Sequence, residues 1–189
     1  MHIWIDIDNH KHVPFIKALV TELKEKGHNV TVTAEDRAEI KQAINKFSLE
    51  TKLIVSTFSI FGMFEEQIII IRAHLLSDYI KDKNITLAFS LGSRPIPRVC
   101  LELKIPIISL LEDYKQKIHW IYHTLYNSFF LISDTIPDSL MIEQGYDINL
   151  IAKYKGNSRL ENLEHDIKAI KNIIDQMSYL SGKMNIAQA

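Results

Sequence analysis

The sequence is poor in the features that define several classes of protein. It has one cysteine, Cys100, in 189 residues, so no disulfide can form within the chain. Its longest apolar runs, residues 68–71 and 129–132, are far shorter than the roughly 20 residues that a transmembrane helix needs. The chain turns acidic at Asp6 and lacks the basic start of a signal peptide. We therefore expect a cytoplasmic protein with no membrane span.

Neither sign of charge dominates the chain. It has 22 lysines and arginines against 23 aspartates and glutamates, for a formal net charge of -1 at pH 7. This balance gives no whole-chain attraction to nucleic acid or to an anionic membrane. We expect no nucleic-acid partner, and a ligand that binds at a local site.

The chain does contain an alternation of short β-branched runs with longer amphipathic stretches. This alternation is typical of βαβ units, and it predicts an α/β fold with a Rossmann-like parallel sheet and helices on both faces. The expected strands are residues 3–7, 29–33, 52–56, 87–90, 107–110 and 129–133. The expected helices are one from Pro14 to a stop at Gly27, and residues 34–46, 65–81, 97–104, 114–126 and 137–144.

The end of the chain has a different pattern, so we divide the sequence into a domain, residues 1–156, and an amphipathic helical tail, residues 157–189. Apolar residues recur in the tail at spacings of three and four, as in a coiled-coil seam. They are Leu160, Leu163, Ile167, Ile170, Ile174 and Met177. The pattern leaves two interpretations open: the helix docks on its own domain, or residues 160–180 join two copies of the chain or bind a partner.

Polar side chains follow three of the expected strands. Because ligands of parallel sheets collect at the carboxyl ends of the strands, these loops are expected to form one site. The loops contain Asp8, Asn9, His10 and His12; Gly92, Ser93 and Arg94; and Glu112 and Asp113. The helix after His12 would add the free amide groups of its N-terminus.

Other interpretations of these residues stay open. Asp8 and Asn9 could equally cap the following helix. A metal held by His119 and His123 is disfavoured because no acidic residue lies between them, and the spacing of His10 and His12 suits a strand better than a loop. We predict no metal site.

Three stretches together resemble the domain-of-unknown-function family 354. They are "IWIDIDNHKHVPFIKALVTELKEKGHNVTVTAED", then "FSLGSR" with "LKIPIISLLEDY", and finally "YKG", which ends at Gly156. The family is similar to GT-B enzymes, which include nucleotide-sugar glycosyltransferases and UDP-N-acetylglucosamine 2-epimerase and have two Rossmann-like domains. The resemblance covers an N-terminal domain only, so a truncated GT-B protein is expected. The family residues that match are Asp8, Asn9, His12, Val13, Gly92, Ser93, Arg94, Asp113 and Tyr114, whereas His10 and Lys11 replace its usual proline pair.

The resemblance implies the acceptor-side half of a nucleotide-sugar-dependent glycosyltransferase or sugar epimerase, without the nucleotide-binding C-terminal domain. A separately encoded C-terminal domain or a homodimer would complete the site. No bound cofactor is implied, and the donor would be a UDP-sugar or another nucleotide sugar. In this hypothesis His12 is the general base or an acceptor contact, and Asp8 orients it. The substrate-binding residues would be Asn9, Ser93, Arg94, Glu112 and Asp113, with Arg94 holding an anionic group.

Two other functions remain alternatives. "WIDID" is similar to the start of haloacid-dehalogenase-like phosphatases, with Asp6 as nucleophile and Asp8 as general acid around Mg²⁺, although the later motifs fit poorly. The chain could also be a non-catalytic interaction protein that associates through its tail.

Overall fold

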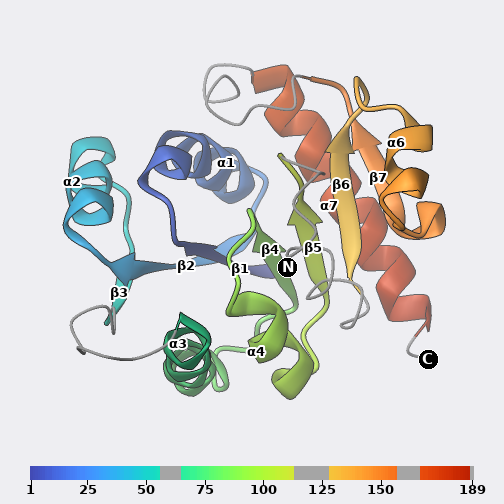
Figure 1. The fold of residues 1–189 in the computed structure, drawn as a ribbon. Helices are drawn as coiled ribbons and strands as arrows, with labels where there is room; N and C mark the ends of the chain where they lie inside the picture. The colour runs from blue at the N-terminus through green and yellow to red at the C-terminus, as the bar shows by residue number, and fades with distance from the viewer. Residues whose placement is uncertain (56–64, 113–127, 157–166, 188–189) are drawn as a thin grey trace.

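A computed structural model of the chain describes residues 1–55, 65–112, 128–156 and 167–187. The described residues form a seven-stranded sheet in the order β3-β2-β1-β4-β5-β6-β7, and every neighbouring pair of strands is parallel (Figure 1). The strands are β1 (His2–Ile7), β2 (Asn29–Asp36), β3 (Lys52–Val55), β4 (Leu87–Ser90), β5 (Ile107–Leu110), β6 (Phe129–Ser133) and β7 (Ile151–Tyr154). The predicted Rossmann-like α/β fold is confirmed.

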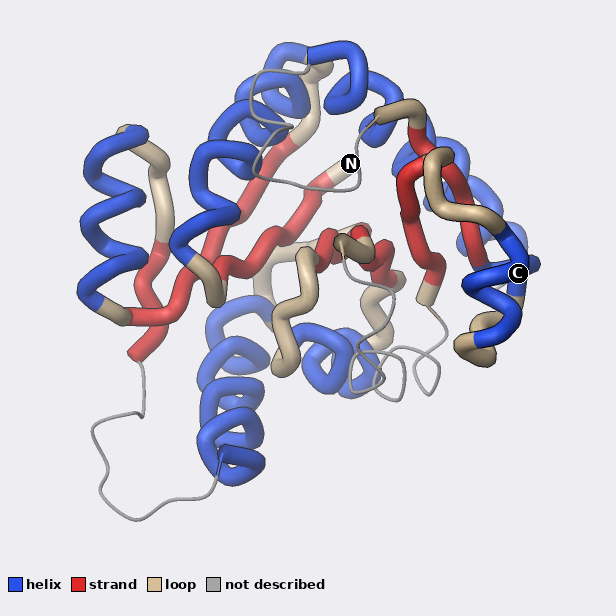
Figure 2. The backbone as a smooth tube through the Cα atoms, turned by 45° about the horizontal axis from the view of Figure 1, so that its top comes forward, coloured by secondary structure: helices blue, strands red, loops and turns tan. Residues whose placement is uncertain are grey.

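Helices pack on both faces of the sheet. Figure 2 shows the strands, in red, between two layers of helices, in blue. The α-helices are α1 (Val13–Glu25), α2 (Ala38–Phe47), α3 (Glu65–Ile80), α4 (Ile96–Leu103), α6 (Asp138–Glu143) and α7 (Ile167–Ala187), with short 3-10 helices η1 (His10–His12) and η3 (Ile148–Leu150). Helices α1, α2 and α7 share one hydrophobic core, whereas α3 and α4 pack in another on the opposite face. None of the described helices has the length and apolar character needed to cross a lipid bilayer.

The alternation of side chains along β1 connects the two cores. Ile3, Ile5 and Ile7 point into the core beneath α1, and Trp4 points into the core of α3 and α4. Because successive side chains of a strand face opposite sides of the sheet, Asp6 lies on the same face as Trp4. An acidic side chain is therefore placed between the sheet and α3, where it needs a partner.

Local chemistry explains where α1 begins and ends. Pro14 occupies the first turn, where its missing N–H costs nothing, and Gly27 follows the helix with a φ of +82°. The buried face of α1 contains Phe15, Leu19 and Leu23. This short connection brings β2 beside β1, with His2 opposite Asn29.

The predicted strands and helices differ from the observed ones in a few places. Residues 34–36 were expected to begin a helix, but they extend β2, because they pair with β3 and α2 begins only at Ala38. The seventh strand, β7, was not predicted. The expected helix at residues 114–126 lies outside the described residues.

Helix α7 packs along β6 and β7 beside α1 (Figure 1). Its seam residues Ile170, Ile174 and Met177 are buried in the core that also contains Leu19 and Leu23 of α1. On the surface, Lys26 Nζ lies 2.7 Å from Asp175 Oδ1. These three seam residues therefore pack on their own domain, whereas Leu160 and Leu163 lie outside the described residues. Association of two chains through residues 160–180 stays a prediction.

Candidate functional site

A large cavity in the described part of the chain lies at the carboxyl ends of β1, β4 and β5, where a parallel sheet is expected to bind its ligand. Its volume is about 750 Å³. Polar side chains from the loop after β1 line it together with Gly92 and Glu112 from the loops after β4 and β5. Those from the first loop are Asp8, Asn9, His10, Lys11 and His12, and Arg37 and Glu39 face them from the start of α2. The predicted meeting of three loops at one edge is confirmed.

The loop after β1 is held in shape by its own hydrogen bonds. The Asn9 side chain accepts a hydrogen bond from the backbone N–H of Lys11 at 3.1 Å, and the His12 N–H donates to the Asn9 carbonyl at 3.1 Å. Asn9 therefore caps η1, the helix-capping role that the sequence left open, while also lining the cavity. The result is a rigid turn that directs His12 toward Glu112.

His12 and Glu112 lie next to each other in the lining of the cavity. The His12 side chain is 11% exposed, and its Nε2 lies 3.8 Å from Oε2 of Glu112. Nearby, burial and the charges of Glu112 and Asp134 raise the pKa of Tyr154, which keeps that phenol neutral. The contact of His12 with Glu112 places an imidazole and a carboxylate together in the lining of the cavity, as general acid–base chemistry on a ligand hydroxyl requires.

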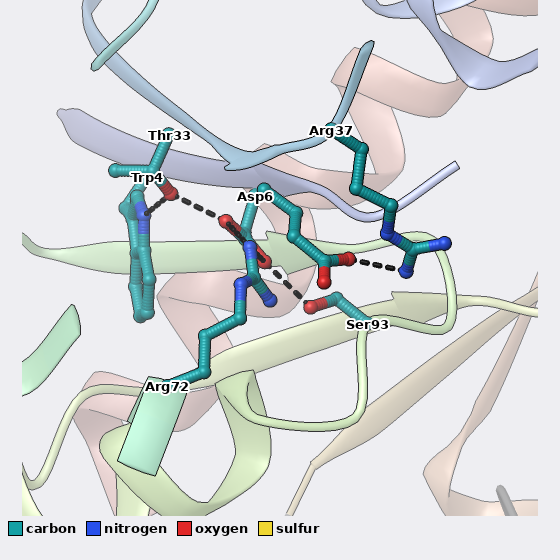
Figure 3. Close-up of polar contacts among 7 residues, drawn as sticks. Trp4, Asp6, Thr33, Arg37, Arg72 and Ser93 are labelled. Carbon is teal, nitrogen blue, oxygen red and sulfur yellow. Dashed lines mark hydrogen bonds and ion pairs between the residues drawn. The ribbon is translucent and has the colours of Figure 1, made fainter. Parts of the chain in front are cut away.

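A buried polar network behind the cavity is centred on Asp6 (Figure 3). Arg72 Nη2 donates to both carboxylate oxygens of Asp6, at 2.7 and 2.8 Å. Thr33 Oγ1 and Ser93 Oγ each donate to Asp6 at 2.7 Å, and the Trp4 indole N–H donates to Thr33 Oγ1 at 2.9 Å. Burial alone would lower the pKa of Arg72, but the hydrogen bonds to Asp6 and the negative charges of Asp6, Glu35 and Asp8 together outweigh burial and raise it. The network joins β1, β2, α3 and the loop after β4.

The Asp6 contacts argue against the phosphatase alternative. A nucleophilic carboxylate must reach both its substrate and Mg²⁺. The Asp6 side chain is 0% exposed, and both of its oxygens accept hydrogen bonds from Arg72 and the two hydroxyl groups. Asp6 is therefore a structural residue in this fold, and the phosphatase interpretation is not favoured.

Asp8 differs from Asp6 because it lines the cavity, and the charges near it include a second carboxylate, that of Asp6. Burial, together with the negative charge of Asp6, raises the pKa of Asp8 to about 6, against the opposing effects of Arg72 and His12. A carboxyl group of this pKa can take up and release a proton near neutral pH, as catalytic acids and bases must.

Replacing Asp8 with Asn is expected to stabilise the protein at pH 7–8 and to have little effect at pH 4. The folded-state pKa of about 6 lies above the unfolded value of 3.8, so the folded protein binds more protons between these values. The free energy of unfolding therefore falls as the pH rises from about 4 to 6. The neutral Asn side chain cannot lose a proton, so the variant does not show this fall. Urea unfolding of both proteins at pH 4 to 8 measures the difference. A variant that is equally destabilised at every pH would contradict the assignment.

The structure brings some predicted site residues together and separates others. Asp8, Asn9, His12 and Glu112 line the large cavity. Ser93 is buried against Asp6, and Arg94 lines a second, smaller cavity on the other side of Asp8. Asp113, Tyr114, His119 and His123 lie outside the described residues. The described residues contain no group of three His, Cys, Asp or Glu side chains able to hold a metal.

Sequence reasoning missed three charged residues next to the site. Glu35 is 3% exposed and forms an ion pair with Arg37, and both lie at the end of β2 in a stretch that was expected to be helical. Arg72 lies inside the run "IIIIRAHLL", where one charged residue among apolar ones was a signal for a buried partner.

A comparison with models of known protein families identifies the family of this chain. The family model described as "Protein of unknown function (DUF354)" matches residues 1–185. The chain belongs to this family. The match includes α7, and no curated protein matches the chain.

Solved structures similar to this DUF354 chain include UDP-GlcNAc 2-epimerases and MurG. A UDP-GlcNAc 2-epimerase from Neisseria meningitidis bound to UDP-GlcNAc is 14% identical, with a TM-score of 0.61 over 94% of this chain and 54% of its own. MnaA from S. aureus with UDP is 12% identical, with a TM-score of 0.64 over 83% of this chain and 44% of its own. Acinetobacter baumannii MurG is 13% identical, with a TM-score of 0.56 over 72% of this chain and 42% of its own.

These likenesses show the fold. The DUF354 chain matches the N-terminal half of the GT-B fold, and it spans about half the length of the structures it resembles.

Proposed function

We propose that the large cavity of this DUF354 chain is the acceptor-side wall of a nucleotide-sugar-dependent glycosyltransferase or sugar epimerase cleft. The proposal rests on the position of the cavity. A cavity of about 750 Å³, lined by Asp8, His12 and Glu112, lies at the strand ends of a fold that resembles the N-terminal halves of UDP-GlcNAc 2-epimerases and MurG. Its size suits one or two sugar rings.

The side chains of the cavity suit proton transfer to and from a sugar. In the proposed reaction, the neutral ring of His12 accepts a proton from a ligand hydroxyl through Nε2, and Glu112, 3.8 Å away, stabilises the imidazolium. Asp8 attracts the protonated His12 electrostatically and so helps to hold the charged ring in the cavity. Asn9 offers its amide group to ligand hydroxyls from the rigid turn.

A second wall is part of the proposal. The cavity is open to solvent on one side, and a reaction that releases a nucleoside diphosphate needs positive charge or amide donors opposite His12. We propose that another domain, from the same polypeptide or from another chain, supplies them.

Ligand binding tests this function. We expect the melting temperature of the purified chain to rise with a nucleotide sugar or its free sugar, screened as UDP-, GDP-, CDP- and TDP-sugars with and without Mg²⁺. A ligand present at ten times its Kd stabilises the folded state by about 1.4 kcal/mol. In the His12→Ala variant this shift is expected to disappear, because His12 lines the cavity.

His74→Ala is the matched control, because His74 lies on the outer surface of α3 with its side chain 74% exposed. The melting temperature of His74→Ala should rise with each ligand by as much as that of the unmodified chain. An equal shift in His12→Ala would contradict the proposal, and so would the absence of a shift with every free sugar, because the cavity of this chain is itself proposed to bind the sugar.

A further inference from the structure

A second cavity of about 40 Å³ lies next to the large one. It is lined by Asp8, Glu35, Arg37, Arg72 and Arg94 together with three apolar residues, Ile68, Ile69 and Pro95. Asp8 and Arg37 also line the large cavity, so these two side chains form the wall between the two spaces. The small cavity has room for about three water molecules, which is the size of a carboxylate group and far less than a sugar ring.

The polar lining of the small cavity includes a buried hydrogen-bond donor. Arg72 is 3% exposed, and its Nη2 group makes both bonds to Asp6. No acceptor for the Nε–H of Arg72 exists among the described residues. A buried guanidinium donor without an acceptor costs free energy, and an acidic oxygen placed in the cavity would remove that cost.

We propose that this small cavity is a subsite for a carboxylate group of the ligand, held by Arg72 and Arg94, and that the carboxylate binds together with a proton on Asp8. Guanidinium groups bind carboxylates through charge-assisted hydrogen bonds, which are strongest where water is excluded, and Arg72 has its Nε–H to donate. The ligand would enter the subsite from the large cavity beside Asp8 and Arg37, which line both spaces.

The charges around Asp8 explain why a proton must accompany the carboxylate. The groups that face Asp8 come from five elements of the fold: Asp6 from β1, His12 from η1, Glu35 and Arg37 from the end of β2, Arg72 from α3 and Arg94 from the loop after β4. When Asp8 takes up a proton, the cavity wall loses one negative charge, so an incoming carboxylate is repelled less. Binding of the carboxylate should therefore strengthen as the pH falls through about 6.

The subsite names a class of substrate for the proposed function, on which this inference rests. A ligand with a sugar ring in the large cavity and a carboxylate in the small one is an acidic sugar, such as a uronic acid. The neutral sugar amide of the same shape fills the same space but brings no charge to Arg72 and Arg94.

Binding of D-glucuronate and D-glucuronamide to the purified chain tests the subsite. We expect glucuronate to bind about tenfold more tightly than glucuronamide at pH 5, as for a hydrogen-bonded charge pair, and the ratio to fall to about two or less at pH 7.5. Titrations followed by NMR report both affinities, and the ring signals of His12 show whether each sugar occupies the large cavity.

Variants separate the subsite from general binding. Asp8→Asn should keep the preference for glucuronate at both pH values, and Arg94→Gln should abolish it at pH 5. Arg98→Gln is the matched control, because Arg98 is exposed on α4 and lines neither cavity. The folded state of each variant is checked by its NMR spectrum.

The possible results distinguish the two proposals. If both sugars bind near His12 with equal affinity at pH 5, the carboxylate subsite is wrong and the proposed function stands. If glucuronate is preferred but Asp8→Asn and Arg94→Gln leave the preference unchanged, the subsite is also wrong. If neither sugar perturbs His12, the proposed sugar cleft itself loses its support.

Discussion

Replacement of Arg72 with methionine is expected to lower the free energy of unfolding by about 3–5 kcal/mol, the usual cost of removing one partner from a buried ion pair. The Arg72 side chain is 4% exposed and that of Asp6 is 0% exposed, so water cannot replace the lost guanidinium. Methionine fills a similar volume, which limits the effect of a cavity. Urea unfolding followed by circular dichroism measures the change.

The reason for this large effect is the carboxylate that remains. The double variant Asp6→Asn with Arg72→Met should recover much of the lost stability, because it leaves no unpaired buried charge, and the amide can accept a hydrogen bond from one of the Thr33 and Ser93 hydroxyl groups and donate to the other. Lys81→Met, which breaks the exposed pair with Asp78, is the matched control and should leave the urea midpoint unchanged. If Arg72→Met unfolds at the same urea concentration as the unmodified chain, the Asp6 network does not support the fold.

A chain that ends at Gly156 is expected not to fold. Helix α7 buries Ile170, Ile173, Ile174, Met177 and Leu180 in the core that it shares with α1. Burial of five such side chains stabilises the fold by about 8–15 kcal/mol, an upper estimate because the unfolded chain already buries part of this surface. A domain of this size has a total stability of about 5–15 kcal/mol, so the loss of α7 removes most or all of it. Near-ultraviolet circular dichroism and a thermal melt report the outcome.

A chain that ends at Lys183 is the control, because it keeps all five of these buried residues of α7. It should melt cooperatively, like the full chain. A stable, cooperatively folded chain ending at Gly156 would show that α7 is an appendage. The result also bears on association, since dimerisation through residues 160–180 cannot be tested by deleting a helix on which the domain depends.

Much of the candidate site follows from position along the chain. Asp8, His12 and Glu112 follow strands that the sequence indicates by their β-branched residues, and the carboxyl ends of parallel strands share an edge. The sequence therefore predicts that His12 and Glu112 lie near each other, but it does not predict their distance of 3.8 Å.

The charged residues behind the cavity could not be predicted in the same way. Arg72 is 66 residues from Asp6, and Ser93 is 87 residues away, so no local pattern connects them. Arg37 was assigned to a helix because its neighbours have helical spacing, whereas pairing of Thr33 to Asp36 with β3 extended the strand. Such pairing depends on the neighbouring strand and overrides local propensity.

The sequence by itself determined the alternation of strands and helices, the apolar seam of α7, and the edge where the polar loops meet. These are local properties, because side-chain periodicity and strand-end position can be read from neighbouring residues. Tertiary structure decided that the seam of α7 packs on α1, that Asp6 is neutralised by Arg72, and that Asp8 keeps a pKa of about 6 between two cavities. These outcomes depend on burial and on charges brought together from distant parts of the chain, which no local pattern specifies.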